Sequence, residues 1–215
     1  MIGGNVTNEL NHNIILNHNI INIFPISIHQ IDVNGFDKVK DELIDYAYDL
    51  QKQNPIGRKR SNYGGWQSYP FDVNNKDDLL HSFLINCLTN FLYIKESVHM
   101  FASAWININK TSHYNIKHHH PVCDLSGVLW LKAPQDSGII KFQNPVDFQS
   151  YNLIDSYIDE FKNCNKINHS WWFTPTEGRM LIFPSHLLHH VEPNESKEDR
   201  ISVSFNLNLR NTEYD

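Results

Sequence analysis

The spacing of apolar residues changes along the chain and separates a helical first part from a β-rich second part. Residues 36–52 and 76–93 each place apolar side chains three and four positions apart, the spacing that buries one face of a helix. Residues 23–31 alternate between apolar and polar side chains and predict a strand. We expect the two helices to pack on a sheet.

After Ser97 the apolar residues fall into short runs separated by turn-forming residues. Runs of this length and spacing are typical of the strands of a sandwich, barrel or jelly roll. They are HMFASAWINI, LSGVLWLKA, GIIKFQN, WWFTP, GRMLIFP and RISVSFNLNL. Residues 147–163 interrupt the series and predict an inserted helix or a long lid-like loop. The predicted class is therefore mostly β with flanking helices.

A length of 215 residues suits one domain. Residues 1–21 are rich in Asn and Ile and predict a low-complexity leader, whose histidines we do not expect to bind a metal. We expect residues 22–215 to form a single domain, with a helical scaffold over 36–97 and the β core over 98–210.

Composition disfavours several function classes. The net charge of −6 disfavours a duplex nucleic-acid partner, and the one basic run, Arg58-Lys59-Arg60, is typical of a solvated turn. No apolar run approaches the roughly 18 residues of a membrane helix. The first residues lack the pattern of a secretory signal, and the three cysteines are odd in number and widely spaced. We therefore expect reduced thiols, no membrane partner and a cytoplasmic location.

Thirteen histidines are the feature that points to chemistry. His118 and His120 lie two residues apart, so an extended segment directs both to one side while His119 faces away. A second cluster, with His189 and His190, follows a later strand, and imidazoles from separate strands suit iron, copper, nickel or zinc. A loop of solvated histidines is the alternative for the first cluster alone. The residues by themselves do not choose between His189 and His190.

The carboxylate of a 2-His-1-carboxylate iron site is absent from its usual place, two residues after the first histidine. Asp124 is the nearest carboxylate, and a fully extended chain would put it about 13 Å from His120. Only a turn at Pro121 would bring the two together.

Arg200 opens the alternating strand RISVSFN and shares one face of it with Ser202 and Ser204. A guanidinium beside hydroxyl groups suits a bidentate clamp on a carboxylate. A solvated arginine at a strand end is the alternative, and the upstream histidines favour the clamp.

Four motifs carry a resemblance to a known family: N-x-x-H-x-H-P, L-S-G-V, F-P-S-x-x-x-H-x-V-x-P-N and R-I-S-x-S-F-N. Together with the G-W-Q-S element at 65–68, they resemble a family of 2-oxoglutarate and iron(II) dependent oxygenases that is distantly similar to prolyl hydroxylases. The resemblance covers residues 23–210. It implies a double-stranded β-helix, a jelly roll of the cupin-like kind, with Fe(II) and 2-oxoglutarate as cofactors.

Carried over to this sequence, the resemblance places His118, His120 and His189 at the metal. It places Arg200 and Ser202 at the distal carboxylate of 2-oxoglutarate. The usual acidic ligand is then replaced by His120, which gives a three-histidine site.

Further candidate positions lie near the cosubstrate. The resemblance places Asn115 within the first metal motif, while Asn107 and Asn109, which alternate on the preceding strand, are candidate hydrogen-bonding partners of the cosubstrate. Trp130 stands where prolyl hydroxylases often place a tyrosine that binds the cosubstrate.

The implied activity is hydroxylation of a C–H bond with dioxygen, while 2-oxoglutarate is decarboxylated to succinate. The sequence does not specify the substrate, a protein side chain or a small molecule, or the oligomeric state. Two other functions fit the same histidines: a three-histidine cupin-like dioxygenase that does not use 2-oxoglutarate, and a non-catalytic jelly-roll binding module.

Overall fold

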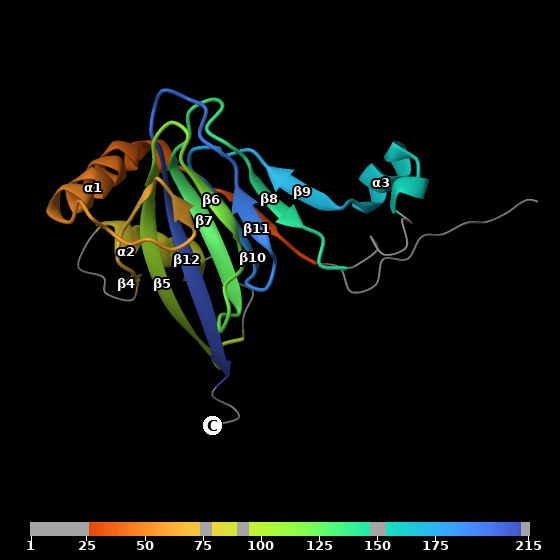
Figure 1. Cartoon of the computed structure of the whole chain (residues 1–215). Helices are drawn as coiled ribbons and strands as arrows, with labels where there is room; N and C mark the ends of the chain where they lie inside the picture. Colours follow the sequence, from red (N-terminus) through yellow and green to blue (C-terminus); the bar gives the residue numbers. More distant parts are fainter. Residues whose placement is uncertain (1–25, 74–78, 90–94, 147–153, 212–215) are drawn as a thin grey trace, which may run out of the picture.

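Two antiparallel sheets face each other, and helices α1 and α2 lie against the larger one (Figure 1). The computed structural model describes residues 26–73, 79–89, 95–146 and 154–211. The leader expected at 1–21 lies outside the described residues.

The larger sheet has seven strands and contains the longest strands of the chain. Its order is β1 (His29–Asp32), β10 (Arg179–Pro184), β7 (Leu125–Lys132), β12 (Arg200–Asn211), β5 (Val98–Asn109) and β3 (Trp66–Gln67), with β4 (Phe71–Asp72) also paired to β5. The pairing of β12 with β5 runs over both strands' full length. This long central pair gives the sheet a continuous surface.

The smaller sheet has five short strands. Its order is β2 (Asn62–Tyr63), β6 (Tyr114–His118), β11 (His189–Val191), β8 (Ile140–Gln143) and β9 (Ser170–Phe173). Because β6 and β11 are neighbours, both histidine clusters of the sequence reach the same sheet.

Alternation along β12 creates two different surfaces on the larger sheet. Ile201, Val203 and Phe205 are buried in a core that the sheet shares with α1 (Lys40–Gln53) and α2 (Leu79–Thr89). Arg200 and Ser202 fall on the other face, toward the smaller sheet. A second apolar core, which includes Trp130, Phe142 and Phe183, fills part of the space between the sheets.

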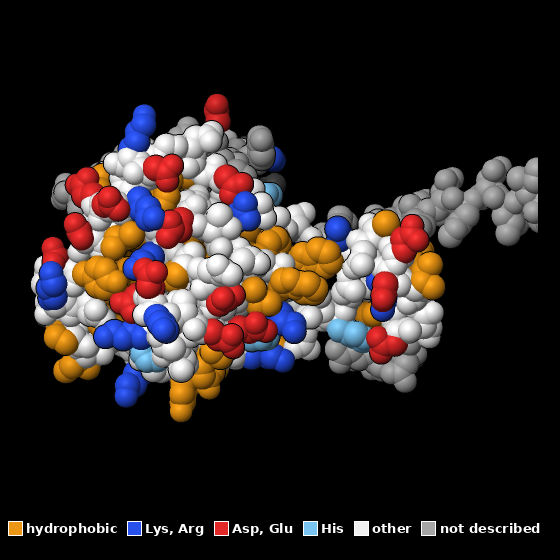
Figure 2. Space-filling view, turned by 90° about the horizontal axis from the view of Figure 1, so that it is seen from above, with side chains coloured by type: hydrophobic (Ala, Val, Ile, Leu, Met, Phe, Trp, Pro, Cys, Tyr) orange, Lys and Arg blue, Asp and Glu red, His pale blue; other side chains and the backbone are white. Residues whose placement is uncertain are grey.

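Both predicted helices are present, although residues 76–78 and 90–93 of the second stretch lie outside the described residues. The stretch 36–52 begins as a 3-10 turn, η1 (Phe36–Lys38), before α1, and the stretch 76–93 contains α2. Within the predicted insertion 147–163, the described part holds η3 (Ile154–Ser156) and the start of α3 (Asp159–Asn165). Both views show the described part of this insertion, which includes α3, lying outward beyond β8 and β9 as a separate lobe (Figures 1 and 2).

The sequence pattern missed the shortest strands. β2, β3 and β4 have two residues each, and β11 has three, which is too short for an alternating pattern to be detected. Of the predicted strand 23–31, only its last residues lie in β1, while 23–25 lie outside the described residues. No helix in the described part of the chain is long and apolar enough to span a membrane.

Candidate metal and cosubstrate site

His118 and His189 sit directly opposite each other on neighbouring strands. They are register partners of β6 and β11, and their ring centroids are 4.4 Å apart. In each histidine Nδ1 contacts the backbone carbonyl two residues earlier, Ile116 at 2.7 Å and Leu187 at 2.8 Å. A carbonyl oxygen only accepts, so each Nδ1 must carry the hydrogen and each Nε2 keeps its lone pair. This tautomer is the one that a metal ligand needs.

His120 joins this pair from just beyond the end of β6. Its backbone N–H donates to the carbonyl of Ser185 at 3.0 Å, which fixes the chain after the strand. The ligand atoms of His118, His120 and His189 all lie within 4.8 Å of one another. His119 and His190 are not part of this cluster. The structure therefore brings together the three histidines that the resemblance singled out.

Burial keeps these imidazoles neutral. Desolvation lowers the pKa of His189 to about 3 and that of His120 to about 4, and it also lowers the pKa of His118. All three rings are therefore uncharged at pH 7, with lone pairs available to a cation.

Asp124, considered above as a metal ligand, instead forms hydrogen bonds with β12. Its Oδ2 accepts from the backbone N–H of Leu209 at 2.7 Å, and its own N–H donates to the carbonyl of Leu207 at 3.0 Å. These bonds hold the carboxylate against β12, and it is outside the histidine cluster. The turn at Pro121 does not bring it to the histidines.

The three histidines line a cavity between the two sheets. Arg200 lies on the wall of this cavity that the larger sheet forms, opposite the histidines. Its side chain is buried, and Nη1 donates to the backbone carbonyls of Ser137, Gly138 and Glu192. Nη2 is also buried but has no hydrogen-bond partner among the described residues. Burial lowers the pKa of Arg200 to about 10, so the guanidinium remains charged at pH 7. One edge of the guanidinium is thus fixed by the protein, while the other is left for an anion.

The predicted cosubstrate residues Ser202, Asn107 and Asn115 also line this cavity, but they differ in how many of their hydrogen-bonding groups are already occupied. Ser202 and Asn107 are register partners on β12 and β5, and both line it. Nδ2 of Asn107 donates to Ser204 at 3.0 Å, while its buried Oδ1 has no partner among the described residues. Asn115 also lines the cavity, but its amide already bonds Asn109 at 3.1 Å and Ser61 at 3.3 Å. Asn115 therefore also helps to hold the cavity wall.

Ser61 and Trp105 are among the lining residues that sequence reasoning missed. The ring of Trp105 lies 5.8 Å from that of His120. Its signal was present in the strand AWININ, where Trp105 shares the face of Asn107. Ser61 carries no comparable signal, because it lies in an irregular segment before β2.

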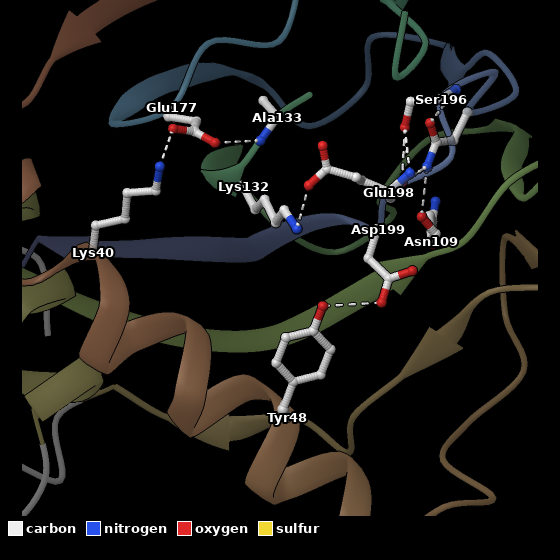
Figure 3. Close-up of polar contacts among 10 residues, drawn as sticks. Lys40, Tyr48, Asn109, Lys132, Ala133, Glu177, Ser196, Glu198 and Asp199 are labelled. Carbon is white, nitrogen blue, oxygen red and sulfur yellow. Dashed lines mark hydrogen bonds and ion pairs between the residues drawn. The ribbon is translucent and has the colours of Figure 1, made fainter. Parts of the chain in front are cut away.

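The loop that leads into Arg200 is braced from several sides (Figure 3). Tyr48 of α1 donates to Asp199 at 3.0 Å, and Lys132 pairs with Glu198 at 2.8 Å. Desolvation, followed by the bond to Asp199, raises the pKa of Tyr48 to about 12, so this donor stays protonated. These contacts fix the position from which β12 begins.

Asn194 is the buried centre of the same loop, and its loss should destabilise the fold. Its side chain donates to the carbonyls of Asn109 and Glu198 at 2.9 and 2.7 Å and accepts from the N–H of Ser196 at 3.0 Å. Asn194→Ala leaves buried groups unsatisfied at about 1–3 kcal/mol each. We expect Tm to fall by about 6–12 °C, measured by calorimetry. Asn163→Ala, on an exposed helical position, is the matched control, and an equal fall in both variants would contradict this role.

Comparisons with known proteins agree with this geometry. Residues 103–206 match the family described as "Putative 2OG-Fe(II) oxygenase". The match identifies this segment as similar to the 2OG-Fe(II) oxygenase family. It runs from residue 103 within β5 to residue 206 within β12 and therefore contains all three histidines and Arg200. No curated protein matches the chain by sequence.

Solved structures show the same fold at low sequence identity. A prolyl-4-hydroxylase from Pseudomonas putida is 13% identical, with a TM-score of 0.60 over 86% of this chain and 94% of that one. A prolyl hydroxylase from Trichoplax adhaerens, in complex with a hypoxia inducible factor peptide, is 10% identical, with a TM-score of 0.57 over 84% and 82%. The epimerase SnoN from nogalamycin biosynthesis, in complex with Fe3+, α-ketoglutarate and nogalamycin RO, is 12% identical, with a TM-score of 0.55 over 85% and 78%.

The predicted fold class, a double-stranded β-helix with flanking helices, is thus confirmed. The family match and the solved structures point to a 2-oxoglutarate-dependent Fe(II) oxygenase. The residues present fit both cofactors. Three neutral imidazoles suit a divalent iron, and the buried, unpartnered Nη2 of Arg200 suits a carboxylate.

Proposed function

We propose that the oxygenase binds Fe(II) through His118, His120 and His189 and 2-oxoglutarate through Arg200, and that it hydroxylates a C–H bond of its substrate. One observation carries this proposal. The three histidines line the same cavity as Arg200, whose Nη2 has no hydrogen-bond partner among the described residues. A metal and an anion can therefore be held between the two sheets at the same time.

The protein side chains hold the metal and the cosubstrate in position and do not themselves react. His118 and His189 present Nε2 because their Nδ1 atoms are held by carbonyls, so the rings need little reorientation on binding. Arg200 is likewise held in place through Nη1. Ser202 and Asn107 add hydrogen-bonding groups on the same wall. When bound, Fe(II) and 2-oxoglutarate supply the oxidative chemistry with dioxygen, and 2-oxoglutarate leaves as succinate and carbon dioxide.

Charge balance favours the same assignment. Three neutral imidazoles leave the full double charge of the metal uncompensated, and Arg200 adds a further positive charge on the opposite wall. A dianionic cosubstrate that spans the two meets positive charge at both ends. The enclosed wall between them, formed by Val128, Trp130 and Phe183, excludes water from its carbon chain.

The proposal is tested by asking whether activity requires both Fe(II) and 2-oxoglutarate. Anaerobic addition of 2-oxoglutarate to the Fe(II)-loaded protein should produce a visible charge-transfer band, and air should then release succinate. We expect neither the band nor succinate when either cofactor is omitted. Oxygen consumption that does not depend on 2-oxoglutarate would instead support a direct three-histidine dioxygenase. A protein that binds the metal but shows neither band nor oxygen consumption would be a binding module.

A further inference from the structure

A second, outer basin of about 720 Å3 opens on the other side of the histidine cluster. It shares His118, His120, Trp105 and Ser61 with the inner cavity. The histidines therefore stand at the boundary between the two spaces. If the inner space holds the cosubstrate, as proposed above, the outer basin is where a substrate reaches the metal.

The basic run Arg58-Lys59-Arg60 lines this basin. The sequence suggested a solvated turn, and the structure gives all three side chains a place on the basin wall. The backbone of the run is fixed, because the N–H of Arg58 donates to Gln67 at 2.7 Å and that of Arg60 to Asn62 at 2.7 Å. The Arg58 guanidinium also lies over the ring of Tyr69, 5.6 Å from its centroid. The run therefore lies at a fixed place on the basin wall, and Tyr69 further positions the guanidinium of Arg58.

These charges are not neutralised by the described part of the protein. None of the three forms an ion pair there, whereas Lys40, Lys132 and Arg179 each pair with a carboxylate. No carboxylate of the described residues lines the basin. Elsewhere acidic and basic side chains are interspersed, as on the face seen in Figure 2, and the chain as a whole carries −6. Because the charged side chains that line the basin are all positive and its walls have a low dielectric constant, their electric field attracts an incoming anion.

The remaining walls are largely apolar. Trp105, Pro70, Pro121 and Ile116 contribute them. The volume lies within the range of about 300–1,000 Å3 that is usual for small-molecule sites. A groove for single-stranded nucleic acid would need a basic track with several aromatic platforms, and here the cations are confined to one run of three residues.

We propose that the substrate is a small organic anion, whose carboxylate or phosphate group is bound by Arg58, Lys59 and Arg60 while its carbon skeleton lies against Trp105 and faces the metal. This assignment rests on the proposed function and adds the substrate class to it. A guanidinium recognises a carboxylate or a phosphate through paired hydrogen bonds, so both anions share the same chemistry.

The test measures binding rather than turnover. The metal-loaded full chain, kept anaerobic and saturated with 2-oxoglutarate to fill the inner cavity, is screened by ligand-observed NMR. The probes are small carboxylic acids and phosphate monoesters, each paired with its methyl ester or free alcohol. We expect acids to bind and their neutral partners not to bind. We further expect at least a tenfold loss of affinity in the Arg58→Ala/Lys59→Ala/Arg60→Ala variant, and a large loss in 0.5 M salt. Carboxylates and phosphates are compared separately to identify the anion.

Two variants control this experiment. Lys38→Ala/Lys110→Ala/Lys197→Ala removes three exposed cations outside the basin and should bind as the wild type does. Arg58→Lys/Arg60→Lys keeps the charge and should recover much of the affinity. Equal losses in both triple variants, or equal binding of acids and neutral analogues, would overturn the proposal. Tighter binding of a single-stranded oligothymidylate than of any small acid would also overturn it. Failure of the wild type to bind 2-oxoglutarate at all would count against the proposed function, a separate result.

Discussion

Replacement of Arg200 by alanine is expected to raise the Kd for 2-oxoglutarate by about 100-fold. Arg200 is the buried cation on the cavity wall opposite the histidines, and its Nη2 has no partner in the described structure. Charge-assisted hydrogen bonds contribute about 1.5–3 kcal/mol each, and two such bonds correspond to a factor of 100 or more. The lowered pKa of about 10 does not weaken this effect, since the side chain is protonated at pH 7.

The measurement is titration of the visible band of the anaerobic Fe(II) protein with 2-oxoglutarate. Arg200→Lys keeps the charge but loses the planar fork, so its affinity should fall between those of the wild type and Arg200→Ala. Arg210→Ala removes an exposed arginine near Phe101 and serves as the matched control. Nη1 also donates to backbone carbonyls, so loss of Arg200 can destabilise the fold. The Tm of each variant is therefore measured as well. An unchanged Kd in a folded Arg200→Ala protein would contradict the anchor role.

Replacement of His189 by alanine is expected to weaken Fe(II) binding by about 100-fold or more, since even loss of a ligand's supporting contact typically costs 10–100-fold. His189 is the most deeply buried of the three rings and lies opposite His118. The neutral state that burial imposes on it makes its lone pair available at pH 7. Anaerobic calorimetric titration with Fe(II), supported by the visible spectrum with Co(II), measures the loss.

Two controls separate this role from general effects on the fold. His190→Ala changes the adjacent residue, which is outside the cluster, and should bind metal as the wild type does. Asp124→Asn replaces the charged acceptor of the Leu209 N–H by an amide oxygen and should leave metal affinity unchanged. If Asp124→Asn lost the metal while His120→Ala retained it, the three-histidine assignment would be wrong.

The sequence predicted the fold where its periodic patterns were long. β5, β7 and β12 have at least eight residues each and were recognised by their apolar residues and turns. The alternation on β12 also predicted correctly that Arg200 and Ser202 face away from Val203. Local pattern alone could not pair β6 with β11, because the residues involved are 71 apart and each strand is short.

The candidate site was predicted in part from residue pattern and in part from family resemblance. Spacing indicated that His118 and His120 share a side, whereas the choice of His189 over His190 needed the resemblance. The structure places the chosen three together, and their role at a metal stays a prediction. The basic run at Arg58 could not be assigned to the site from sequence, since its approach to His120 depends on how β2 and β3 join different sheets.

The division of the site between two sheets has a consequence for stability. The histidines belong to the smaller sheet or its edge, while Arg200 starts one of the two longest strands of the larger one. A cosubstrate bound to both would tie the sheets together as a cross-link does, and the free energy of its binding would oppose their separation by RT ln(1 + [L]/Kd). The short strands β6 and β11 would then gain the most protection against hydrogen exchange. The cofactors of this oxygenase would thus serve as structural ties as well as reagents.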